Sequence, residues 1–303
     1  MRDLAIIGGG AAGITAGIYA ARKFIDTLLI TSDFTGQVGI SAWVENYPGF
    51  KKITGLDLIK NFKEHLDMFE IDKEAFKTVE KIKKIKGGFE IITDEAAYQA
   101  KSVIIASGSL PRKLNVKNED KFLGKGISYC VTCDETAFKG KTVAVIGGGN
   151  AGLEGAIELS GFCSKVYVLE ILNKLGADEI LVEEAKKINK IKIITSAEIK
   201  AFAGNTDLEK IIYMDKKSNR QKELPIDGCF IEIGAMPNSS FVKGFLNLNK
   251  KEEIIVDPYT LETSIKGIFA AGDVNDLPGK QIVIACGQGA AALLSAYNYL
   301  YKN

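Results

Sequence analysis

The chain carries one short pattern twice, and this repeat restricts its possible folds more than any other feature. Residues 4–13 read LAIIGGGAAG, and residues 143–152, 139 positions later, read VAVIGGGNAG. Each copy begins with an aliphatic run typical of a buried parallel strand and passes through three glycines into small residues that suit a helix start. Glycine allows a tight turn and a close backbone approach that other residues forbid. The repeat therefore predicts two copies of one nucleotide-binding unit.

Strands and helices are expected to alternate around both copies. Strands are predicted at residues 27–31, 103–106, 166–169 and 268–271, with a hairpin at 79–93 that turns at 87–88. Helices are predicted at residues 14–23, 56–69, 153–159, 180–188 and 288–300. Such alternation is typical of parallel sheets covered by helices. We therefore predict an α/β fold with two Rossmann-like, three-layer ββα dinucleotide-binding domains.

The first loop has the spacing Gly-x-Gly-x-x-Gly, and its candidate contacts are Gly8, Gly10, Ala11, Ala12 and Gly13. It follows a predicted strand and precedes a predicted helix, which is the context that dinucleotide binding requires. Backbone N–H groups and the helix N-terminus supply positive potential for a pyrophosphate there. The alternative is a glycine-rich turn that binds no ligand.

The second loop repeats this spacing, and its candidate contacts are Gly147, Gly149, Asn150 and Gly152. The strand that follows ends at Glu170, 21 residues after Gly149. An acid at this place accepts hydrogen bonds from a ribose 2′-hydroxyl and repels a 2′-phosphate. Lys174 is the only cation in the next segment, residues 171–178. If this loop binds a nicotinamide cofactor, NADH is favoured over NADPH; alternatively, Glu170 merely ends a strand at the surface.

The composition excludes several classes of protein. The 303 residues include 39 basic and 38 acidic side chains, and a net charge of +1 offers no electrostatic footprint for nucleic acid or an anionic membrane. No apolar run reaches the ~18 residues that span a bilayer. The first residues lack the apolar core of a signal peptide, so we expect a cytoplasmic protein with reduced or catalytic cysteines. With His65 as the only histidine, Ser-His-Asp and histidine-metal mechanisms are disfavoured.

Two cysteines form a C-x-x-C-D motif, Cys130 to Asp134, shortly before the second loop. Such a pair is either a redox dithiol or half of a zinc site, and zinc needs four ligands. The other cysteines are isolated in apolar surroundings and are expected to fill the core: Cys163, Cys229 and Cys286. A redox disulfide is therefore favoured. Its thiolate would attack a partner disulfide, the neighbouring thiol would resolve the mixed disulfide, and Asp134 is the obvious proton donor.

Two nucleotide loops with an intervening C-x-x-C-D resemble the low-molecular-weight thioredoxin reductases over nearly the whole chain. The resemblance is carried by GGGAAG at 8–13, GQVGISAWVENYPG at 36–49, ASG at 106–108, CVTCD at 130–134, GGGNAG at 147–152, GAMPN at 234–238 and GIFAAGDV at 267–274. It implies a homodimer in which a pyridine-nucleotide domain is inserted into an FAD domain. We predict boundaries of 1–113 and 241–303 for the FAD domain and 114–240 for the insertion, near polar joins that follow Pro111 and Pro237.

The resemblance also implies roles for individual residues. The implied FAD contacts are Gly8, Gly10, Ala11, Ala12, Gly13, Gln37, Asn46, Gly108, Gly272, Asp273, Lys280, Gln281 and Ile282. Among these, Asp273 would bind the ribityl or phosphate portion, and the backbone of residues 280–282 would approach the flavin ring. Cys133 would face the flavin, Cys130 would attack thioredoxin, and Asp134 would be the acid. In the family, the inserted domain rotates and so presents the cysteines alternately to the flavin and to thioredoxin.

One segment departs from the family pattern. The family carries a histidine and arginines after the strand that ends here at Glu170, and those cations bind the NADPH 2′-phosphate. Ile171 and Leu172 occupy the arginine positions. The pattern is closer to the NADH-using flavoprotein reductases of peroxiredoxin systems. After Asp134, where the family often has glycine, this chain has Glu135, a negative charge whose role the sequence leaves open.

Three functions follow from these observations. The first is electron transfer from NADH through FAD and the Cys130–Cys133 pair to thioredoxin or a similar small dithiol protein. The second keeps the dithiol and replaces NADH with reduced ferredoxin, as in clostridial-type reductases. Those reductases have lost the second glycine loop, which this chain retains, so the first function is favoured. The third is a non-enzymatic, nucleotide-binding redox sensor.

Overall fold

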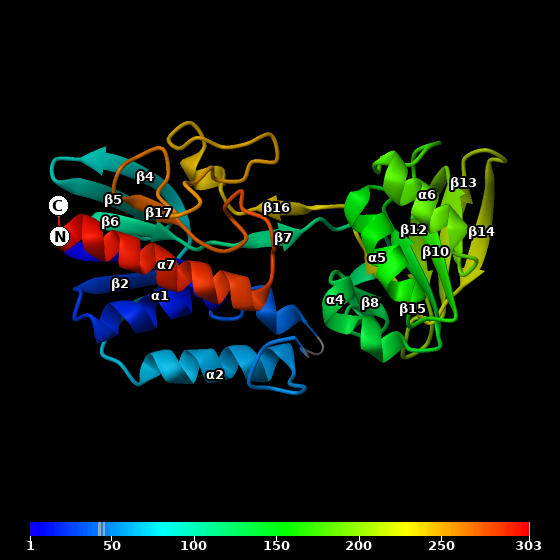
Figure 1. Ribbon diagram of the computed structural model, residues 1–303, viewed down its shortest axis with the longest axis horizontal. Coiled ribbons are helices and arrows are strands. Elements are labelled where there is room, and N and C mark those ends of the chain that lie inside the picture. The colour runs from blue at the N-terminus through cyan, green and yellow to red at the C-terminus, as the bar shows by residue number, and fades with distance from the viewer. Residues whose placement is uncertain (42–43, 45, 303) are drawn as a thin grey trace. The chain divides into compact units, whose positions relative to one another are not determined.

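The computed structural model describes residues 1–41, 44 and 46–302, so three positions of the 36–49 segment lie outside the described residues. Contacts divide the chain into two compact units (Figure 1). The first comprises Met1–Ile40, Glu45–Leu110 and Met236–Asn303, and the second comprises Ser41–Val44 and Pro111–Ala235. Apart from the short segment Ser41–Val44, the chain passes between the units at β7 (Ser109–Pro111) and β16 (Ala235–Pro237), which pair with each other. The domain boundaries given above stay predictions.

A seven-stranded sheet forms the centre of the first unit. Its order is β3 (Asp72–Ala75), β2 (Thr27–Thr31), β1 (Arg2–Ile7), β6 (Ala97–Ile105), β5 (Gly88–Thr93) and β4 (Val79–Ile85), with β17 (Ile268–Ala270) paired to β6. Strands β1, β2, β3, β6 and β17 are parallel, and the predicted hairpin β4–β5 is antiparallel. The carboxyl ends of the parallel strands therefore share one edge, where ligands bind in open α/β sheets.

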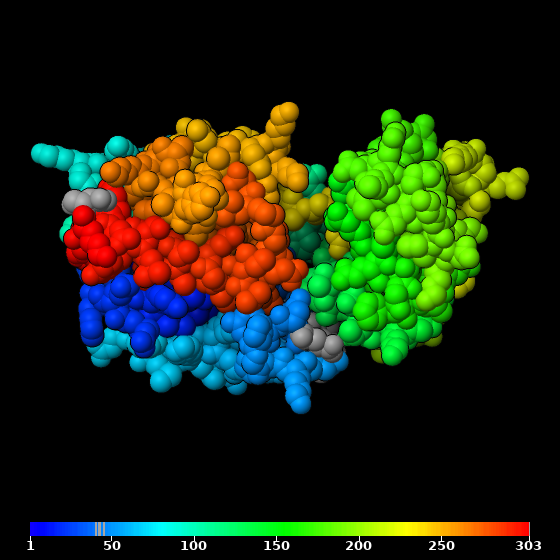
Figure 2. Space-filling view, in the orientation of Figure 1, coloured from blue at the N-terminus to red at the C-terminus, as the bar shows by residue number. Residues whose placement is uncertain are grey.

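The helices of this unit pack on the sheet or on one another. They are α1 (Ala11–Arg22), α2 (Gly55–Asp67) and α7 (Ile282–Tyr301), with short 3-10 turns η1 (Val38–Ile40) and η3 (Ser240–Val242). In Figure 1, α1 and α7 run side by side. Figure 2 shows α7, in red, along the visible face of the first unit.

Helix α7 begins six residues before the predicted start at residue 288, so that prediction was wrong at its boundary. Gly287 and Gly289 lie in its first turns, and glycine is a poor helix former. Tertiary packing overrides this propensity, because a Cβ on Gly289 would overlap the carbonyl oxygen of Ala12. Glycine thus lets α7 approach α1 more closely than any other residue would.

The second unit contains a five-stranded parallel sheet. Its order is β11 (Ile191–Thr195), β10 (Lys165–Glu170), β9 (Thr142–Ile146), β15 (Gly228–Ile231) and β8 (Ile127–Ser128). The helices of this unit are α3 (Glu119–Phe122), α4 (Val131–Asp134), α5 (Asn150–Ser160) and α6 (Glu179–Lys187), with a 3-10 turn η2 (Glu135–Phe138). Strand β9 has β10 on one side and β15 on the other, so the strand order reverses there.

An antiparallel sheet completes the second unit, and none of its individual strands was predicted from the sequence. Its strands are β12 (Ala197–Ala203), β13 (Lys210–Asp215) and β14 (Arg220–Pro225). One buried cluster joins it to the parallel sheet and includes Phe202, Ile211 and Cys229. Within the described part of the chain, no helix is both long and apolar enough to cross a membrane.

Candidate active site

The first glycine loop connects β1 to α1 and leaves the start of the helix open. Gly8 has a φ of +117°, and a Cβ there would overlap the carbonyl oxygen of Ala106. A Cβ on Gly13 would overlap the carbonyl oxygen of Gly8. Gly10 precedes the helix, and among the described residues no atom lies within 4 Å of where its Cβ would stand. The loop therefore offers a crevice at the helix N-terminus that suits a pyrophosphate.

The second glycine loop connects β9 to α5 in the same way. Gly147 has a φ of +122°, and a Cβ there would overlap the carbonyl oxygen of Glu232. The space around Gly149 is open within the described structure, as it is around Gly10. The side chain of Asn150 is engaged by the protein itself, since its Nδ2 donates to Asp178 (2.8 Å) and its Oδ1 accepts from the Asp178 N–H (2.8 Å). One N–H and one lone pair of the Asn150 amide remain for a nucleotide, together with its backbone.

Glu170 holds this second loop from the end of β10. Its Oε2 accepts the N–H of Gly148 at 2.7 Å, and its Oε1 accepts the N–H of Leu172 at 2.8 Å. The carboxylate is buried, whereas Ile171 and Leu172 are 50% and 58% exposed. Because each carboxylate oxygen has two lone pairs, Glu170 can still accept a ribose hydroxyl. The residue thus supports the loop and retains the capacity that the sequence analysis assigned to it.

The two cysteines of the C-x-x-C motif form a disulfide at the start of α4. Cys130 and Cys133 have a Cα–Cα distance of 5.3 Å, and both are half-buried. Ser128, which the sequence analysis missed, links the motif together. Its hydroxyl donates to Asp134 Oδ2 at 2.6 Å and accepts the N–H of Cys130 at 3.0 Å. A serine three residues before the first residue of a helix is a common local hydrogen-bonding signal, and it could have been noticed.

Glu135 belongs to a different arrangement, with a partner on α5. Burial, together with the carboxyl group of Glu158, raises the pKa of Glu135 to about 7. The pair lies near Cys163, since the charge of Glu135 contributes to raising the pKa of that thiol. Glu135, which is half-buried, therefore pairs across η2 and α5 with the exposed carboxyl group of Glu158.

The three lone cysteines differ in burial. Cys163 and Cys229 are fully buried, as predicted, and burial raises the pKa of both thiols. Cys286 was expected to fill the core and is instead half-buried. It lies in an early turn of α7, where the hydroxyl of Tyr47 is 3.8 Å from its Sγ. The apolar sequence around it reflects packing on other faces of the same helix.

In the first unit, the predicted FAD residues surround the loop that follows β17. The amide of Gln37 donates to the carbonyl and hydroxyl oxygens of Ser109 (2.6 and 2.9 Å) and to Asp273 Oδ2 (3.2 Å). Burial raises the pKa of Asp273, and the charge of nearby Lys280 opposes the shift. A half-buried carboxyl at the carboxyl end of β17 is suited to accept hydroxyl groups of a ligand.

Two residues that the sequence analysis missed hold this loop from behind. The Oε1 of Gln288 accepts the N–H of Gly272 and the Nδ2 of Asn275, both at 2.8 Å. Asn275 is fully buried and also donates to the carbonyl oxygen of Ala270 at 3.1 Å. A polar side chain inside an apolar helix was the available signal for Gln288.

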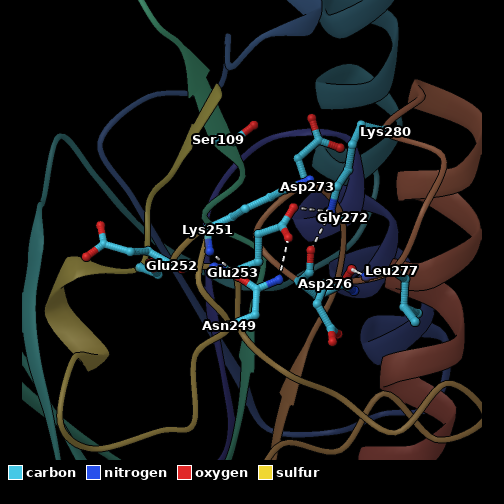
Figure 3. Close-up of polar contacts among 12 residues, drawn as sticks. Ser109, Asn249, Lys251, Glu252, Glu253, Gly272, Asp273, Asp276, Leu277 and Lys280 are labelled. Carbon is cyan, nitrogen blue, oxygen red and sulfur yellow. Dashed lines mark hydrogen bonds and ion pairs between the residues drawn. The ribbon is translucent and has the colours of Figure 1, made fainter. Parts of the chain in front are cut away.

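The side chain of Lys280 is used within the protein (Figure 3). Its Nζ donates to the carbonyl oxygen of Asn275 and lies 3.4 Å from Oε1 of Glu253. The other oxygen of Glu253, Oε2, accepts a hydrogen bond from Nδ2 of Asn249 at 2.6 Å. Gln281 precedes α7 and accepts a hydrogen bond from Asn46 at 3.2 Å. The side chains of Lys280 and Gln281 are thus held by the protein, and the backbone of residues 280–282 stays the predicted approach to the flavin ring.

The ASG segment is tied to residue 238. The hydroxyl of Ser107 donates to the carbonyl oxygen of Asn238 (2.7 Å), and the Asn238 N–H donates to the carbonyl oxygen of Gly108 (2.9 Å). Gly108 has a φ of +67°, a conformation that favours glycine. All the predicted FAD residues therefore lie in the first unit, and the predicted nicotinamide and dithiol residues lie in the second.

These residues fit FAD. The open N-terminus of α1 suits the pyrophosphate, and the half-buried carboxyl of Asp273 suits a ribityl hydroxyl. The assignment of each residue to FAD stays a prediction.

Comparison with known proteins identifies the family. The model of the pyridine nucleotide-disulphide oxidoreductase family matches residues 2–289. A protein named NADH dehydrogenase from Bacillus subtilis is 38% identical over 302 residues, covering 99% of this chain and 59% of the relative. A subunit of the alkyl hydroperoxide reductase from Pseudomonas putida is 39% identical over 304 residues, covering 99% of this chain and 58% of the relative. The chain thus spans a little under three fifths of the length of these curated relatives.

A solved structure matches the whole chain. The thioredoxin reductase of Streptococcus pyogenes superposes with a TM-score of 0.94 at 34% identity, covering 100% of this chain and 99% of that one. The predicted α/β fold with two Rossmann-like domains is thereby confirmed. The chain belongs to the pyridine nucleotide-disulphide oxidoreductase family, and within it the chain resembles the low-molecular-weight thioredoxin reductases.

Proposed function

We propose that this protein passes electrons from NADH through FAD to the Cys130–Cys133 disulfide, and from there to thioredoxin or a similar small dithiol protein. The observation that carries the proposal is the disulfide itself, because it lies within the unit that also holds the second glycine loop. The family match over residues 2–289 supports the same reaction class.

The residues around the disulfide suit its reduction. When bound, FAD would accept a hydride and deliver two electrons to a disulfide. Reduction breaks the S–S bond and needs two protons, one for each sulfur. Asp134 follows Cys133 directly, and the Ser128 hydroxyl fixes its carboxyl group. We assign Asp134 as the group that donates a proton to the leaving thiolate.

The second half of the reaction uses the same two sulfurs. The thiolate of Cys130 attacks the disulfide of the partner and forms a mixed disulfide. The thiol of Cys133 then attacks Cys130, which releases the reduced partner and restores the Cys130–Cys133 bond. Electrons and sulfurs balance, since one disulfide is formed for each one broken.

The surroundings of Glu170 support NADH as the donor. Its buried carboxylate would repel a 2′-phosphate, and the exposed side chains that follow, Ile171 and Leu172, carry no positive charge to bind one. The intact second glycine loop supports a nicotinamide dinucleotide over reduced ferredoxin. A ferredoxin-dependent reaction is the second candidate, because missing cations are compatible with it too.

Anaerobic titration of the yellow, FAD-loaded protein tests the donor. We expect NADH to bleach the flavin absorbance rapidly and NADPH to bleach it poorly. No bleaching by either nucleotide, with bleaching by reduced ferredoxin, would support the second candidate. Steady turnover of thioredoxin disulfide would exclude the redox sensor, and failure of every donor to support turnover would contradict an enzymatic role.

We further propose that the protein works as a cytoplasmic homodimer, as the resemblance implies. Size-exclusion chromatography with light scattering should give twice the monomer mass of 32.8 kDa. A monomer at micromolar concentration would contradict this proposal.

A further inference from the structure

Glu232 is a carboxyl group beside the second glycine loop to which the reaction above gives no role. It follows β15 directly, and its N–H donates to the carbonyl oxygen of Ile146 at 2.8 Å. Its own carbonyl oxygen occupies the space that a Cβ on Gly147 would need. The backbone of Glu232 is therefore in contact with the loop, on the side away from β10.

The sheet topology relates the position of Glu232 to the place where ligands bind. In open α/β sheets, ligands bind outside the carboxyl ends of the strands, at the point where the strand order reverses. That point is β9 here, because β10 and β15 flank it on opposite sides. Glu170 ends β10 and Glu232 follows β15, so the two carboxyl groups stand on either side of the loop.

A dinucleotide extends in two directions from its pyrophosphate. With the pyrophosphate at the N-terminus of α5, one nucleoside lies over the β10 side and the other over the β15 side. Glu170 is placed for the ribose of the adenosine half, as the sequence motif predicts. The β15 side is then left for the nicotinamide half, where Glu232 stands.

The side chain of Glu232 has capacity for a ligand. It is half-buried, and its carboxyl group accepts the N–H of Val131, the first residue of α4. Burial raises the pKa of Glu232 to about 7. Since an ionised carboxylate can accept about four hydrogen bonds, one bond to Val131 leaves most of that capacity unused.

We propose that Glu232 accepts hydrogen bonds from the ribose of the nicotinamide half of the dinucleotide, opposite Glu170 at the adenosine half. This inference rests on the proposed use of NADH. It assigns to the β15 side of the loop a binding role that the glycine motif does not describe.

Three probes of increasing length test the inference on the FAD-loaded protein by isothermal titration calorimetry. ADP contains only the adenosine half, ADP-ribose adds the second ribose, and NAD⁺ adds the nicotinamide. In Glu232→Gln, the amide oxygen can still accept from Val131, but the charge is lost. We expect about tenfold weaker binding of ADP-ribose and NAD⁺, as is typical of a lost charged hydrogen bond, and unchanged binding of ADP.

Controls keep the outcomes separate. Glu184 is an exposed glutamate on α6, and the Glu184→Gln variant should bind all three probes with the affinity of the wild-type protein. Equal affinity of Glu232→Gln and the unchanged protein for ADP-ribose would overturn the inference, and so would an equal loss for ADP, which would show a general effect on the loop. If the unchanged protein binds none of the probes, the NADH proposal itself fails and the inference falls with it.

Discussion

The two glycine loops have almost the same backbone and different surroundings. Gly8 and Gly147 have φ angles of +117° and +122°, and the residues that precede α1 and α5 have φ angles of −83° and −84°. The strand after the first loop, β2, ends at Thr31, whose hydroxyl donates to the carbonyl oxygen of Asp33. The strand after the second loop, β10, ends at Glu170, whose carboxylate accepts a hydrogen bond from the loop itself. The same loop backbone is thus combined with different strand ends, and we propose that the backbone binds a pyrophosphate while the residue at the strand end contacts the ribose.

The two units also differ in the chemistry added to the loop. The second unit carries the disulfide, so replacing Cys133 by Ser should separate the functions. We expect FAD to stay bound and thioredoxin reduction to fall by at least about 1,000-fold, because loss of a nucleophile has effects of that size or larger. Absorbance at the flavin band measures bound FAD, and a turnover assay measures thioredoxin reduction. Retained turnover would show that the dithiol is wrongly assigned.

A matched pair of alanine substitutions tests whether the loops are equivalent. Gly8→Ala should weaken FAD binding, and Gly147→Ala should weaken NAD⁺ binding with FAD retained, each by about 10- to 100-fold. This corresponds to the ~1–3 kcal/mol typical of an unfavourable backbone conformation, to which the overlap with a carbonyl oxygen adds. Each variant is the control for the other in fluorescence and calorimetric titrations. Loss of FAD from Gly147→Ala would break the comparison.

Replacing Glu170 by Ala should sharpen the difference at the strand ends. The N–H groups of Gly148 and Leu172 would lose their acceptor, so NADH affinity should fall by about 1–3 kcal/mol, roughly tenfold or more. Thr31→Ala is the matched change in the other unit and should leave the NADH response unaltered. An unaltered NADH response of Glu170→Ala would mean that Glu170 contributes neither to the shape of the loop nor to nucleotide binding.

The smallest expected effect is a pH dependence at Glu232. Burial raises the pKa of Glu232 to about 7, and the ionised form accepts a ribose hydroxyl better than the protonated form. NAD⁺ affinity should therefore rise a few-fold between about pH 6 and pH 8, and the rise should vanish in Glu232→Gln. The charged groups on neighbouring elements include Glu170 on β10, Asp134 on α4 and the Glu135–Glu158 pair, and the pKa of Glu135 is also about 7. A rise that persists in Glu232→Gln would assign the effect to one of these groups.

Local patterns in the sequence predicted the parts of the site that depend on neighbouring residues. The glycine spacing at 8–13 and 147–152 could be predicted because a tight turn between a strand and a helix has few solutions. A redox disulfide at Cys130–Cys133 was favoured because the other cysteines are isolated in the sequence and zinc needs four ligands. The strands at 27–31 and 166–169 were predicted from apolar runs.

Other parts depend on residues far apart in the chain and could not be predicted. The antiparallel strands β12 to β14 alternate weakly and are stabilised by a shared cluster with the parallel sheet. The early start of α7 depends on Gly289 packing against Ala12. Gln288 and Asn275 meet only because α7 returns to the end of β17.

The sequence by itself determined the two nucleotide loops, the dithiol and the acid that ends β10, because each is a pattern of residues close together in the chain. Only the tertiary structure decided that Glu232 stands opposite Glu170 across the loop. These two residues are brought to one edge by the order of parallel strands. That order depends on hydrogen bonds between β9 and β15, which are separated by more than 80 residues.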